Sequence, residues 1–348
     1  MKIAIDAMGG DNAPVETLKG AVSAINEEND IIVIAVGKKE IIERELSKYQ
    51  YDKSRVEIVD AREVIEMTDE PVSAMKKKKD SSMRVALSLV KEGTADASVS
   101  AGNTGALIAT SQLLLRRLKG VMRPAIATLF PKSNYERLLL LDAGATADCK
   151  PEFLNQFALM GSKYMEIIMG VHNPKVGLIN IGTEEGKGNE LTRNAYDLLR
   201  ANKNINFVGN IEASTYLSED IDVAVSDGFT GNMVLKASEG VSKLIMNTIK
   251  SEVKKSFLAK IGALFLLPSL RKIKKGMDSS EYGGAIFLGL SGISIKAHGS
   301  SDANAIKNAI KVANKFAKMH FIEELTKVID NGIEENGTEE TVGGGDAD

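Results

Sequence analysis

The chain has 348 residues, of which 26% are charged and 43% are hydrophobic, as expected of a globular protein with a large apolar core. Its formal net charge of −3 argues against a general nucleic-acid-binding protein. The single cysteine, Cys149, excludes an internal disulfide and fits a reducing cytoplasm, and the histidines His172, His298 and His320 form no metal-ligand pattern.

Short apolar runs rich in β-branched residues alternate with helix-like segments along almost the whole chain. The strand-like runs are residues 2–7, 31–37, 55–61, 96–102, 125–131, 137–144, 175–182, 205–211, 222–228 and 285–292. The helix-like segments are residues 14–29, 82–92, 103–118, 151–170, 189–202, 230–255 and 302–329. Several strands are continuously apolar, which is typical of strands covered by helices on both faces. The alternation predicts an α/β fold, a three-layer α/β/α sandwich.

The two ends of the chain bound the predicted domain. The N-terminal stretch MKIAIDAMGG leads directly into a strand and has no long apolar segment, so it does not resemble a signal peptide. We expect one two-lobed unit over residues 1–330. Residues 331–348 are acidic and glycine-rich without apolar periodicity, so we expect a disordered tail there.

Residues 254–275, KKSFLAKIGALFLLPSLRKIKK, combine seven cationic side chains with no acidic one. The uncharged run 261–267 is too short to span a bilayer, which takes about 20 apolar residues. Pro268 should interrupt any helix, so we expect two short helical pieces. Lysine and arginine can keep their charges at a lipid surface while apolar side chains enter it, which predicts an amphipathic, membrane-facing insertion. Packing in the core or across a dimer interface is the alternative. The expected contact residues are Phe257, Leu258, Ile261, Leu264, Phe265, Leu267, Lys254, Lys255, Arg271 and Lys272.

Six predicted strands end in small, polar, glycine-rich turns: DAMGGDNAP (6–14), SAGNTGA (100–106), LDAGATADCKPE (141–152), NIGTEEGKGNE (180–190), SDGFTGN (226–232) and KAHGSSDA (296–303). Ligands of open α/β sheets bind at the carboxyl ends of strands, where helix N-termini favour anions such as phosphate. Because parallel strands place these ends on one edge, we expect a composite site there. No turn has the pattern of a dinucleotide-binding loop or a P-loop.

Individual residues of these turns have both structural and functional interpretations. Asn103 and Thr104 can cap a helix, or with Gly105 hold a phosphate or thioester oxygen. Asp142 ends a strand of leucines and can brace a loop or orient a donor. Lys187, between Gly186 and Gly188, is either an exposed loop lysine or an oxyanion-stabilising cation.

Two further turns carry candidate catalytic residues. Asp227 and Gly228 can form a simple turn, or Asp227 can act as an acid/base group with Asn232 as an amide donor. His298 can be structural or a general acid/base at neutral pH. No nucleophile–base pair is evident, and we interpret Cys149 as a bystander. We therefore expect the substrates to react directly, with the protein supplying positioning and charge stabilisation.

These motifs, in this order, together with YGGAIFLGLSGISIKAHGSSDANAI and SDGFTGNMVLKASEG, resemble the bacterial acyl-[acyl-carrier-protein]:phosphate acyltransferase family of phospholipid synthesis. The resemblance covers residues 1–325. It implies a fold related to phosphate acetyltransferases and to isocitrate/isopropylmalate dehydrogenases. It also implies an enzyme that transfers a long-chain fatty acyl group from acyl carrier protein to inorganic phosphate. A membrane glycerol-3-phosphate acyltransferase then uses the acyl phosphate.

The resemblance further implies a homodimer that associates peripherally with the membrane from the cytoplasm and needs no metal or nucleotide cofactor. Under it, the catalytic residues would be Lys187, Asp227, Asn232 and His298. The substrate-binding residues would be Asn103, Thr104, Gly105, Asp142, Gly186, Gly188 and Gly228.

Alternatives remain open at the level of sequence. A phosphate acetyltransferase-like enzyme using acyl-CoA would perform the same chemistry on a small donor. A decarboxylating dehydrogenase would need a metal and a nucleotide site, and the sequence shows neither pattern. A membrane-associated scaffold for acyl carrier protein is the non-enzymatic alternative. The lysines 76–79 form a second basic cluster, which is either a solvated loop or, like 254–275, a region that steers the acidic carrier protein.

Overall fold

The computed structural model describes residues 1–132, 136–218, 220–257, 259–263, 265–266 and 283–339, with only the backbone described for 331–339. Its strands are β1 (Lys2–Asp6), β2 (Ile32–Gly37), β3 (Val56–Asp60), β4 (Ala97–Ser100), β5 (Ala125–Pro131), β6 (Arg137–Leu141), β7 (Lys175–Asn180), β8 (Asn206–Glu212), β9 (Val223–Val225), β10 (Ala285–Leu288) and β11 (Ile293–Lys296).

The α-helices are α1 (Val15–Glu27), α2 (Lys39–Leu46), α3 (Pro71–Lys77), α4 (Ser82–Lys91), α5 (Thr104–Leu114), α6 (Pro151–Tyr164), α7 (Glu190–Ala201), α8 (Gly228–Lys255), α10 (Ala303–Lys318) and α11 (Phe321–Glu339). A short 3-10 turn, η1 (Lys53–Arg55), precedes β3, and a π-helical turn, η2 (Met165–Met169), continues α6. Within the described residues, no helix is both long and apolar enough to cross a membrane.

All strands belong to one eleven-stranded sheet in the order β3-β2-β1-β4-β11-β10-β5-β6-β9-β7-β8. The strands β3, β2, β1, β4 and β11 run parallel to one another. β10 is antiparallel to both of its neighbours, and β5 is antiparallel to β6. Consequently β6, β9, β7 and β8, which are mutually parallel, run opposite to β1.

This reversal corrects the expectation that all six glycine-rich turns lie on one edge. The turns after β1, β4 and β11 follow one strand direction, and the turns after β6, β7 and β9 follow the opposite one.

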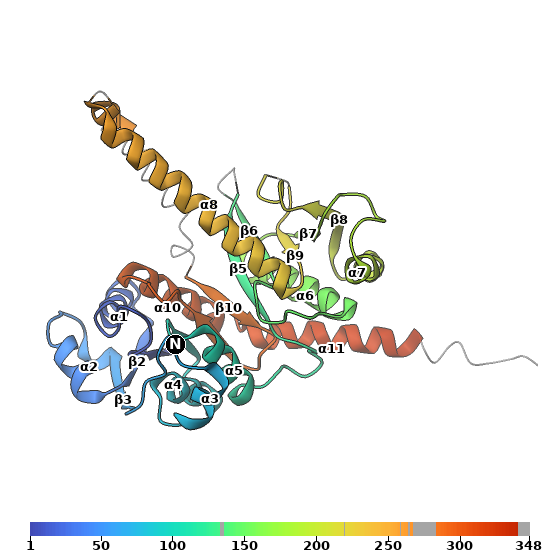
Figure 1. Ribbon diagram of the computed structural model, residues 1–348. Helices are drawn as coiled ribbons and strands as arrows, with labels where there is room; N and C mark the ends of the chain where they lie inside the picture. The colour runs from blue at the N-terminus through green and yellow to red at the C-terminus, as the bar shows by residue number, and fades with distance from the viewer. Residues whose placement is uncertain (133–135, 219, 258, 264, 267–282, 340–348) are drawn as a thin grey trace, which may run out of the picture.

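Helices cover both faces of the sheet, which confirms the three-layer α/β/α sandwich (Figure 1). Ile3 and Ile5 of β1 pack in the larger core under α1 and α10, whereas Ala4 between them packs toward α4 on the other face. The larger core continues without interruption to α6 and α7 beneath the reversed strands. A single core therefore underlies strands of both directions.

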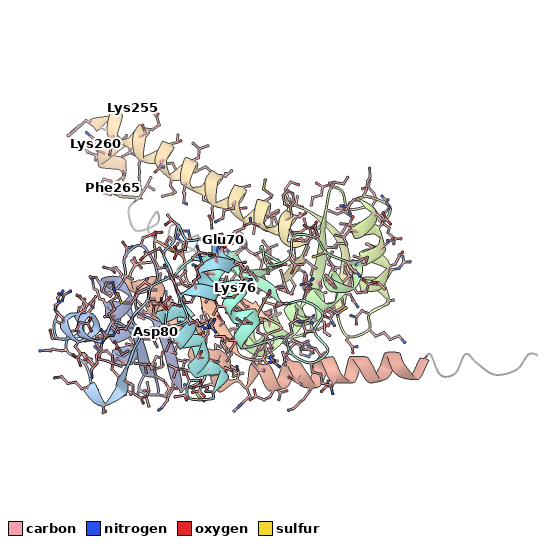
Figure 2. The ribbon with its side chains drawn as sticks, turned by 60° about the horizontal axis from the view of Figure 1, so that its bottom comes forward. Glu70, Lys76, Asp80, Lys255, Lys260 and Phe265 are labelled. Atoms are coloured by element: carbon pink, nitrogen blue, oxygen red, sulfur yellow. The ribbon has the colours of Figure 1, made fainter. Side chains whose placement is uncertain are left out.

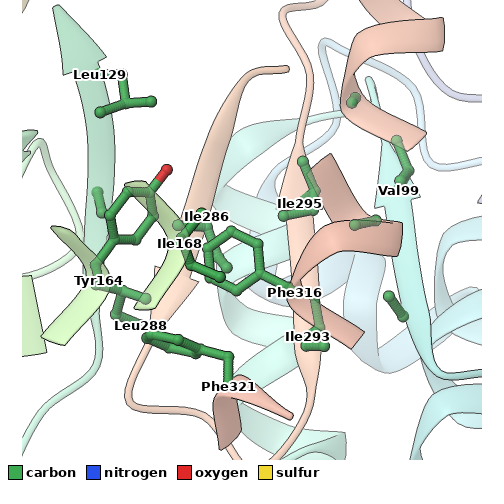
Figure 3. Close-up of a cluster of buried hydrophobic side chains, with 14 of the residues drawn as sticks. Val99, Leu129, Tyr164, Ile168, Ile286, Leu288, Ile293, Ile295, Phe316 and Phe321 are labelled. Atoms are coloured by element: carbon green, nitrogen blue, oxygen red, sulfur yellow. The ribbon is translucent and has the colours of Figure 1, made fainter. Parts of the chain in front are cut away.

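An aromatic cluster joins helices from the two halves of the sheet. Tyr164 at the end of α6 contacts Phe316 of α10 and Phe321 of α11, with ring centroids 5.3 Å and 6.4 Å apart. Phe316 and Phe321 pack edge to face at 4.9 Å. Figure 3 shows these rings next to Ile286 and Leu288 of β10, the strand at which the sheet reverses. Buried aromatic pairs of this geometry stabilise a core beyond the area they bury.

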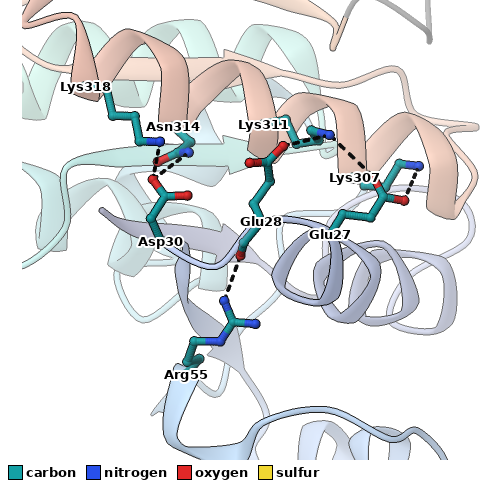
Figure 4. Close-up of polar contacts among 8 residues, drawn as sticks. All are labelled: Glu27, Glu28, Asp30, Arg55, Lys307, Lys311, Asn314 and Lys318. Carbon is teal, nitrogen blue, oxygen red and sulfur yellow. Dashed lines mark hydrogen bonds and ion pairs between the residues drawn. The ribbon is translucent and has the colours of Figure 1, made fainter.

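Charged side chains fasten the C-terminal helix α10 to the N-terminal helix α1 (Figure 4). Lys307 and Lys311 pair with Glu27, at 2.8 Å and 3.4 Å. Lys311 also reaches Glu28 at 2.9 Å. These side chains are only partly buried, so each pair adds little to stability, and the network mainly fixes the orientation of α10.

Some predicted elements need correction. The sequence patterns missed α2, α3 and β11, each short, and they joined α10 and α11 into one helix. His320 lies between these two helices with φ +48°, a left-handed conformation that ends an α-helix. In addition, α11 continues to Glu339, so residues 331–339 are helical rather than a tail without regular structure. Extending an existing helix is far easier than nucleating one. Residues 340–348 lie outside the described part of the chain.

Helix α8 is the longest helix of the described structure and is largely exposed. It has 28 residues, about 42 Å at 1.5 Å per residue, and its only buried residues are Gly228 and Gly231. Figure 1 shows α8 projecting away from the sheet, and Figure 2 shows Lys255, Lys260 and Phe265 at its far end. Of the predicted membrane-contact residues, Leu258, Leu264, Leu267, Arg271 and Lys272 lie outside the described residues.

Candidate active site

Asp6, at the end of β1, joins three segments of the chain. It is only 2% exposed. Its Oδ1 accepts a 2.5 Å hydrogen bond from Ser82 Oγ, and its Oδ2 accepts a 2.7 Å hydrogen bond from Ser100 Oγ. Burial raises the pKa of the Asp6 carboxyl, while these hydrogen bonds act in the opposite direction. Asp6 thereby holds the turn after β1, the turn after β4 and the start of α4 together.

The turn after β1 is also fastened to the turn after β11. The backbone N–H of Asp11 donates to the carbonyl of Gly299 at 2.8 Å. The side chain of Asn12 donates to the carbonyl of Ser300 at 3.2 Å. Gly10 has φ +105°, and a Cβ placed on it would lie 2.9 Å from Cβ of Ala101, in the turn after β4. Glycine is therefore required here for both conformation and space.

Lys296, the last residue of β11, is a buried cation among these turns. It is 8% exposed, and its Nζ donates to the carbonyl of Ala297. Burial lowers the pKa of Lys296 from 10.5 to about 8, and Lys236 acts in the same direction. The carboxylates of Asp6 and Asp11 oppose that shift. A buried lysine with a lowered pKa in such a cluster is a candidate for anion binding or proton transfer.

His298 lies two residues after Lys296, on the exposed side of the turn. Its Nδ1 lies 2.8 Å from Ser300 Oγ and accepts a hydrogen bond from the backbone N–H of Ser300 at 3.2 Å. The neutral ring therefore carries its proton on Nε2. Burial lowers the pKa of His298, and the neighbouring charge of Lys296 lowers it further. The imidazole is thus mainly neutral at pH 7 and can both donate and accept protons.

Helix α8 brings side chains from the reversed half of the sheet to His298. Lys236 and Lys243 of α8 lower the pKa of His298, and Glu239 raises it. Lys236 Nζ pairs with Glu239 Oε2 at 3.1 Å. With Asn232, these residues follow the spacing i, i+4, i+7 and i+11, which places them on one stripe of the helix. This polar stripe runs along α8 from the turn after β9, and its charges act on His298 in the turn after β11.

The predicted substrate-binding residues Asn103, Thr104 and Gly105 begin α5 in the same group of turns. The Oδ1 of Asn103 caps α5 by accepting from Ala106 N–H at 3.0 Å. Its Nδ2 donates to the carbonyls of Met67 and Asp69, at 3.0 Å and 3.2 Å. Both the oxygen and the nitrogen of the Asn103 side-chain amide are therefore used in structural hydrogen bonds. Thr104 is exposed, and the free N–H groups of this helix turn are available to an anion.

Asp142 is fully buried and braces the loop after β6. Its two oxygens accept hydrogen bonds from the backbone N–H groups of Ile126, Gly144, Ala145 and Thr146, at 2.7–3.0 Å. Burial raises the pKa of Asp142, whereas these four donors favour the charged form. Its neighbour Gly228 has no room for a side chain, since a Cβ there would lie 2.6 Å from Asp142 Oδ2. Asp142 positions the start of α8.

Asp227 caps the N-terminus of α8. Its Oδ1 accepts from Thr230 N–H at 2.8 Å, and its Oδ2 accepts from Thr230 Oγ1 at 2.7 Å. Asn232 is exposed, and Gly144 approaches it, because a Cβ on Gly144 would lie 3.4 Å from Asn232 Cβ. Both residues therefore lie where α8 leaves the sheet, and Asn232 starts the polar stripe that reaches His298.

Lys187 lies in the loop between β7 and α7, and its contacts stay within that loop. Its Nζ is 4.0 Å from Glu184 Oε1, with the side chain half exposed. Gly188 has φ +99°, and a Cβ there would lie 2.1 Å from Thr192 Oγ1, so this glycine serves the local turn. Gly186 has open space around it. The structure does not bring Lys187, Gly186 or Gly188 into contact with the group formed by Asp6, Lys296 and His298.

Cys149 fits its interpretation as a bystander. Its Sγ donates to the carbonyl of Thr146 at 3.4 Å. Burial raises the pKa of the Cys149 thiol to about 12, with the carboxylates of Asp142 and Asp227 acting in the same direction. The thiolate needed for nucleophilic attack is therefore scarce at neutral pH.

Sequence reasoning missed several residues of the site. Asp6, Asp11 and Asn12 stand in a turn that was recognised as glycine-rich without any of its side chains being singled out. Lys296 was missed because the strand β11 was missed. The sequence signal that points to Lys296 is a lysine that ends a short β-like run, ISIK, directly before a polar turn. Such a lysine is buried when the strand lies inside the sheet.

Together these residues form a site suited to an anionic substrate. Lys296 and His298 stand at the turn after β11, the start of α5 follows β4, and the charge of Lys236 acts on both Lys296 and His298. No group of three or more His, Cys, Asp or Glu side chains with metal-binding geometry occurs among the residues that the structure describes. The charge arrangement can bind a phosphate and stabilise negative charge that develops beside it.

Comparison of the sequence with known proteins identifies its relatives. Residues 1–324 match the family described as "Fatty acid synthesis protein". A phosphate acyltransferase from Fusobacterium nucleatum is 59% identical over 330 residues, covering 95% of this chain and 99% of that protein. A phosphate acyltransferase from Clostridium perfringens strain SM101 is 51% identical over 329 residues, covering 94% and 97%.

Solved structures with the same fold share far less sequence. A phosphotransacetylase from Streptococcus pyogenes superposes with a TM-score of 0.63 at 16% identity, covering 92% of this chain and 94% of that one. A 4-hydroxythreonine-4-phosphate dehydrogenase from Klebsiella pneumoniae gives a TM-score of 0.51 at 14% identity, covering 91% and 99%. These likenesses confirm the fold, which phosphotransacetylases and dehydrogenases share.

Proposed function

Because the chain is an acyltransferase that belongs to the phosphate acyltransferase family, we propose that it transfers a long-chain fatty acyl group from acyl-[acyl carrier protein] to inorganic phosphate. The product would be an acyl phosphate for the acylation of glycerol 3-phosphate. The observation that carries the proposal is the buried Lys296 next to His298, at the meeting point of three turns and the polar stripe of α8.

Phosphate binding is assigned to Lys296 and to the start of α5. The ammonium of Lys296 offers a charge-assisted hydrogen bond, and the free N–H groups after Asn103 point toward an anion at the helix start. With Asp6 and Asp11 nearby, Lys296 is held in place before substrate binds. Such preorganisation lowers the cost of orienting phosphate beside a thioester.

The reaction is a direct displacement. A phosphate oxygen attacks the thioester carbonyl carbon, forming a C–O bond and a tetrahedral oxyanion. The oxyanion then collapses, the C–S bond breaks, and the carrier thiolate leaves and takes up a proton. Lys296 and Lys236 stabilise the negative charge, and the Nε2–H of His298 donates to the oxyanion or to the leaving sulfur. No covalent enzyme intermediate is needed.

Asp142 and Asp227 act as positioning residues in this proposal, because their carboxylates hold the loop after β6 and the start of α8. Asn232 is assigned a donor role at the base of the polar stripe. A catalytic role for Lys187, flanked by Gly186 and Gly188, stays a prediction. Turnover by Lys187→Ala tests it, since a wild-type rate would remove Lys187 from the site.

A phosphate acetyltransferase-like activity on acyl-CoA is the second candidate, favoured by the shared fold with phosphotransacetylases. One experiment separates the two. Purified protein is supplied with phosphate and either palmitoyl-carrier protein or acetyl-CoA, and the release of free thiol is measured. We expect phosphate-dependent release from the carrier protein and little from acetyl-CoA. Release from acetyl-CoA alone would establish the second candidate instead.

We further propose that the protein works as a homodimer at an anionic membrane surface, near the membrane enzyme that uses its product. The apolar stripe of α8 includes Met233, Val241 and Leu244, which are 57%, 55% and 65% exposed, so this face of the helix is left uncovered within the described chain. At the far end of α8, Phe257 and Phe265 are 77% and 82% exposed among lysines. Large apolar side chains flanked by cations suit a lipid interface.

A further inference from the structure

We propose that the acidic carrier protein docks on the lysine cluster at the end of α3, formed by Lys76, Lys77 and Lys79, and not on the basic far end of α8. This inference rests on the proposed function, because it concerns the protein that delivers the acyl group. The carrier must place its thioester arm beside Lys296 and His298. The docking surface is therefore a charged surface close to that site.

The lysine cluster is exposed, and its three lysines, Lys76, Lys77 and Lys79, have no ion-pair partner in the described part of the chain. The fourth lysine of the run, Lys78, is different, because its Nζ bonds to Asp69 and to the carbonyl of Val64. Lys78 thereby anchors the segment, and the other three point their charge to solvent.

Acidic side chains near the cluster are occupied by local backbone contacts. Glu70 caps α3 by accepting from the N–H groups of Val72 and Ser73, at 3.1 Å and 2.6 Å. Asp80 accepts from the N–H of Arg62 at 2.9 Å. These carboxylates stabilise the turns at both ends of α3 and do not pair with the three lysines. Within the described structure, the three lysine charges therefore stand unpaired at the surface of a chain whose net charge is negative.

Short connections link the cluster to the candidate active site. Lys79 precedes Ser82 by three residues, so their Cα atoms are at most about 11 Å apart. The hydroxyl of Ser82 donates to Asp6 at 2.5 Å. At the other end of α3, a Cβ on Gly105 would lie 2.7 Å from Pro71 Cγ, so α3 packs directly against the start of α5.

The rival basic cluster is much farther from the chemistry. Lys236 is the α8 residue whose charge acts on Lys296, and Lys255 follows it by 19 helical positions, or about 28 Å of helix. Figure 2 shows Lys76 on the body of the molecule and Lys255 and Lys260 at the far end of α8.

The apolar side chains near each cluster distinguish a protein from a lipid partner. Next to α3 they are few and moderate in size, since Met67 and Val72 are 41% and 46% exposed. The far end of α8 instead exposes the aromatic rings of Phe257 and Phe265. Charge with modest apolar contact suits an acidic protein, and charge with exposed aromatic rings suits a bilayer.

Two matched triple variants test the assignment. The first is Lys76→Gln/Lys77→Gln/Lys79→Gln at α3, and the second is Lys254→Gln/Lys255→Gln/Lys260→Gln at the far end of α8. Each removes the same number of charges. Steady-state kinetics are measured with palmitoyl-carrier protein and with an acyl-pantetheine of the same chain length, at low and at high salt. Binding of fluorescent carrier protein without an acyl group is titrated in parallel.

We expect the α3 variant to raise KM for palmitoyl-carrier protein by about tenfold at low salt, with kcat within about twofold of wild type. The effect should shrink at high salt, because exposed charges are then screened. Kinetics with acyl-pantetheine should be unchanged, and carrier binding should weaken in parallel. The α8 variant should match the wild-type enzyme with both donors.

The result that overturns the proposal is an α3 variant with wild-type carrier kinetics and binding. The proposal is equally overturned if the loss of carrier binding and the rise in KM appear in the α8 variant. It is also overturned if the α3 variant loses binding to phosphatidylglycerol vesicles while its carrier kinetics are unchanged. Failure of the proposed function is distinct from all of these. In that case the wild-type protein would release no thiol from either donor.

Discussion

Ser82 Oγ donates a 2.5 Å hydrogen bond to Oδ1 of Asp6, although 76 positions separate the two residues in the chain. The bond joins the start of α4 to the end of β1. Because Asp6 is buried, its carboxylate depends on this hydroxyl and on that of Ser100 for solvation. The position of the turn after β1 therefore depends on residues contributed by other strands and helices.

Ser82→Ala should destabilise the protein by about 1–3 kcal/mol, because it leaves a buried carboxylate oxygen without its hydroxyl donor. Urea unfolding measures the change. Ser23→Ala is the matched control, since that hydroxyl donates to the carbonyl of Lys19 on the surface, and its effect should stay within about 0.5 kcal/mol. Equal stabilities of the two variants would contradict the structural role assigned to Ser82.

Lys296→Met should raise KM for phosphate by at least about tenfold at pH 7, because it removes a buried charge-assisted donor. In the wild-type enzyme, phosphate binding should weaken as the pH rises through about 8, where Lys296 loses its proton. The variant should lack this dependence. A wild-type KM for phosphate in the variant would remove Lys296 from the anion site.

Lys296 should also leave a signature in the stability of the protein. The pKa of Lys296 is about 8 in the folded state and near its ordinary value of 10.5 in the unfolded state. Between these pH values the unfolded state binds more protons, so the free energy of unfolding gains a contribution from Lys296 that rises with pH. Comparing urea unfolding of wild type and Lys296→Met at pH 8 and pH 10 tests the sign. If the free energy of unfolding of wild type relative to Lys296→Met fell as the pH rises, the predicted sign would be wrong.

Two glycines of α8 should respond in opposite ways to alanine. A Cβ on Gly231 would lie 1.9 Å from the carbonyl oxygen of Asp142, whereas nothing lies within 4 Å of one on Gly240. Gly231→Ala should therefore displace the start of α8 and lower both stability and turnover. Gly240→Ala should stabilise the helix by about 0.5–1 kcal/mol. Thermal unfolding measures the stability of both variants. A Gly231→Ala variant as stable as the wild-type protein would show that α8 does not pack on Asp142 as described.

Leu244→Glu should convert the proposed dimer to a monomer, because it buries an unpaired carboxylate in the apolar stripe of α8. Analytical ultracentrifugation measures the oligomeric state. Lys250→Glu, on the polar side of the same helix, should leave the dimer intact. If Leu244→Glu has the same mass in solution as the wild-type protein, the α8 stripe is not the dimer interface.

Phe265→Glu should release the protein from anionic vesicles while soluble turnover is retained, since Phe265 lies far from the site at the end of α8. Co-sedimentation with phosphatidylglycerol vesicles measures binding. Val208→Glu, at an exposed position of β8, provides a control with the same added charge. Unchanged vesicle binding by Phe265→Glu would favour the alternative, in which this segment packs against protein.

Local sequence patterns are enough to predict the classes of element and to indicate the family. All ten predicted strands correspond to strands of the structure, because apolar runs of this length and their flanking glycines are local features. The glycine-rich turns and His298 were likewise recognisable from short stretches of chain. Short elements such as α2, α3 and β11 were missed, since a few residues carry too little periodicity to distinguish them from loops.

Which turns lie next to one another depends on long-range strand pairing. Strand order and direction follow from pairing between distant segments, so the reversal at β10 and β5 left no signal in the sequence. The same holds for the charge cluster, because Asp6 and Lys296 come from opposite ends of the chain and meet where β1, β4 and β11 lie side by side in the sheet. Burial, and with it the lowered pKa of Lys296, is a property of what packs around a side chain. Local sequence sets the side chain itself, and the fold sets its surroundings.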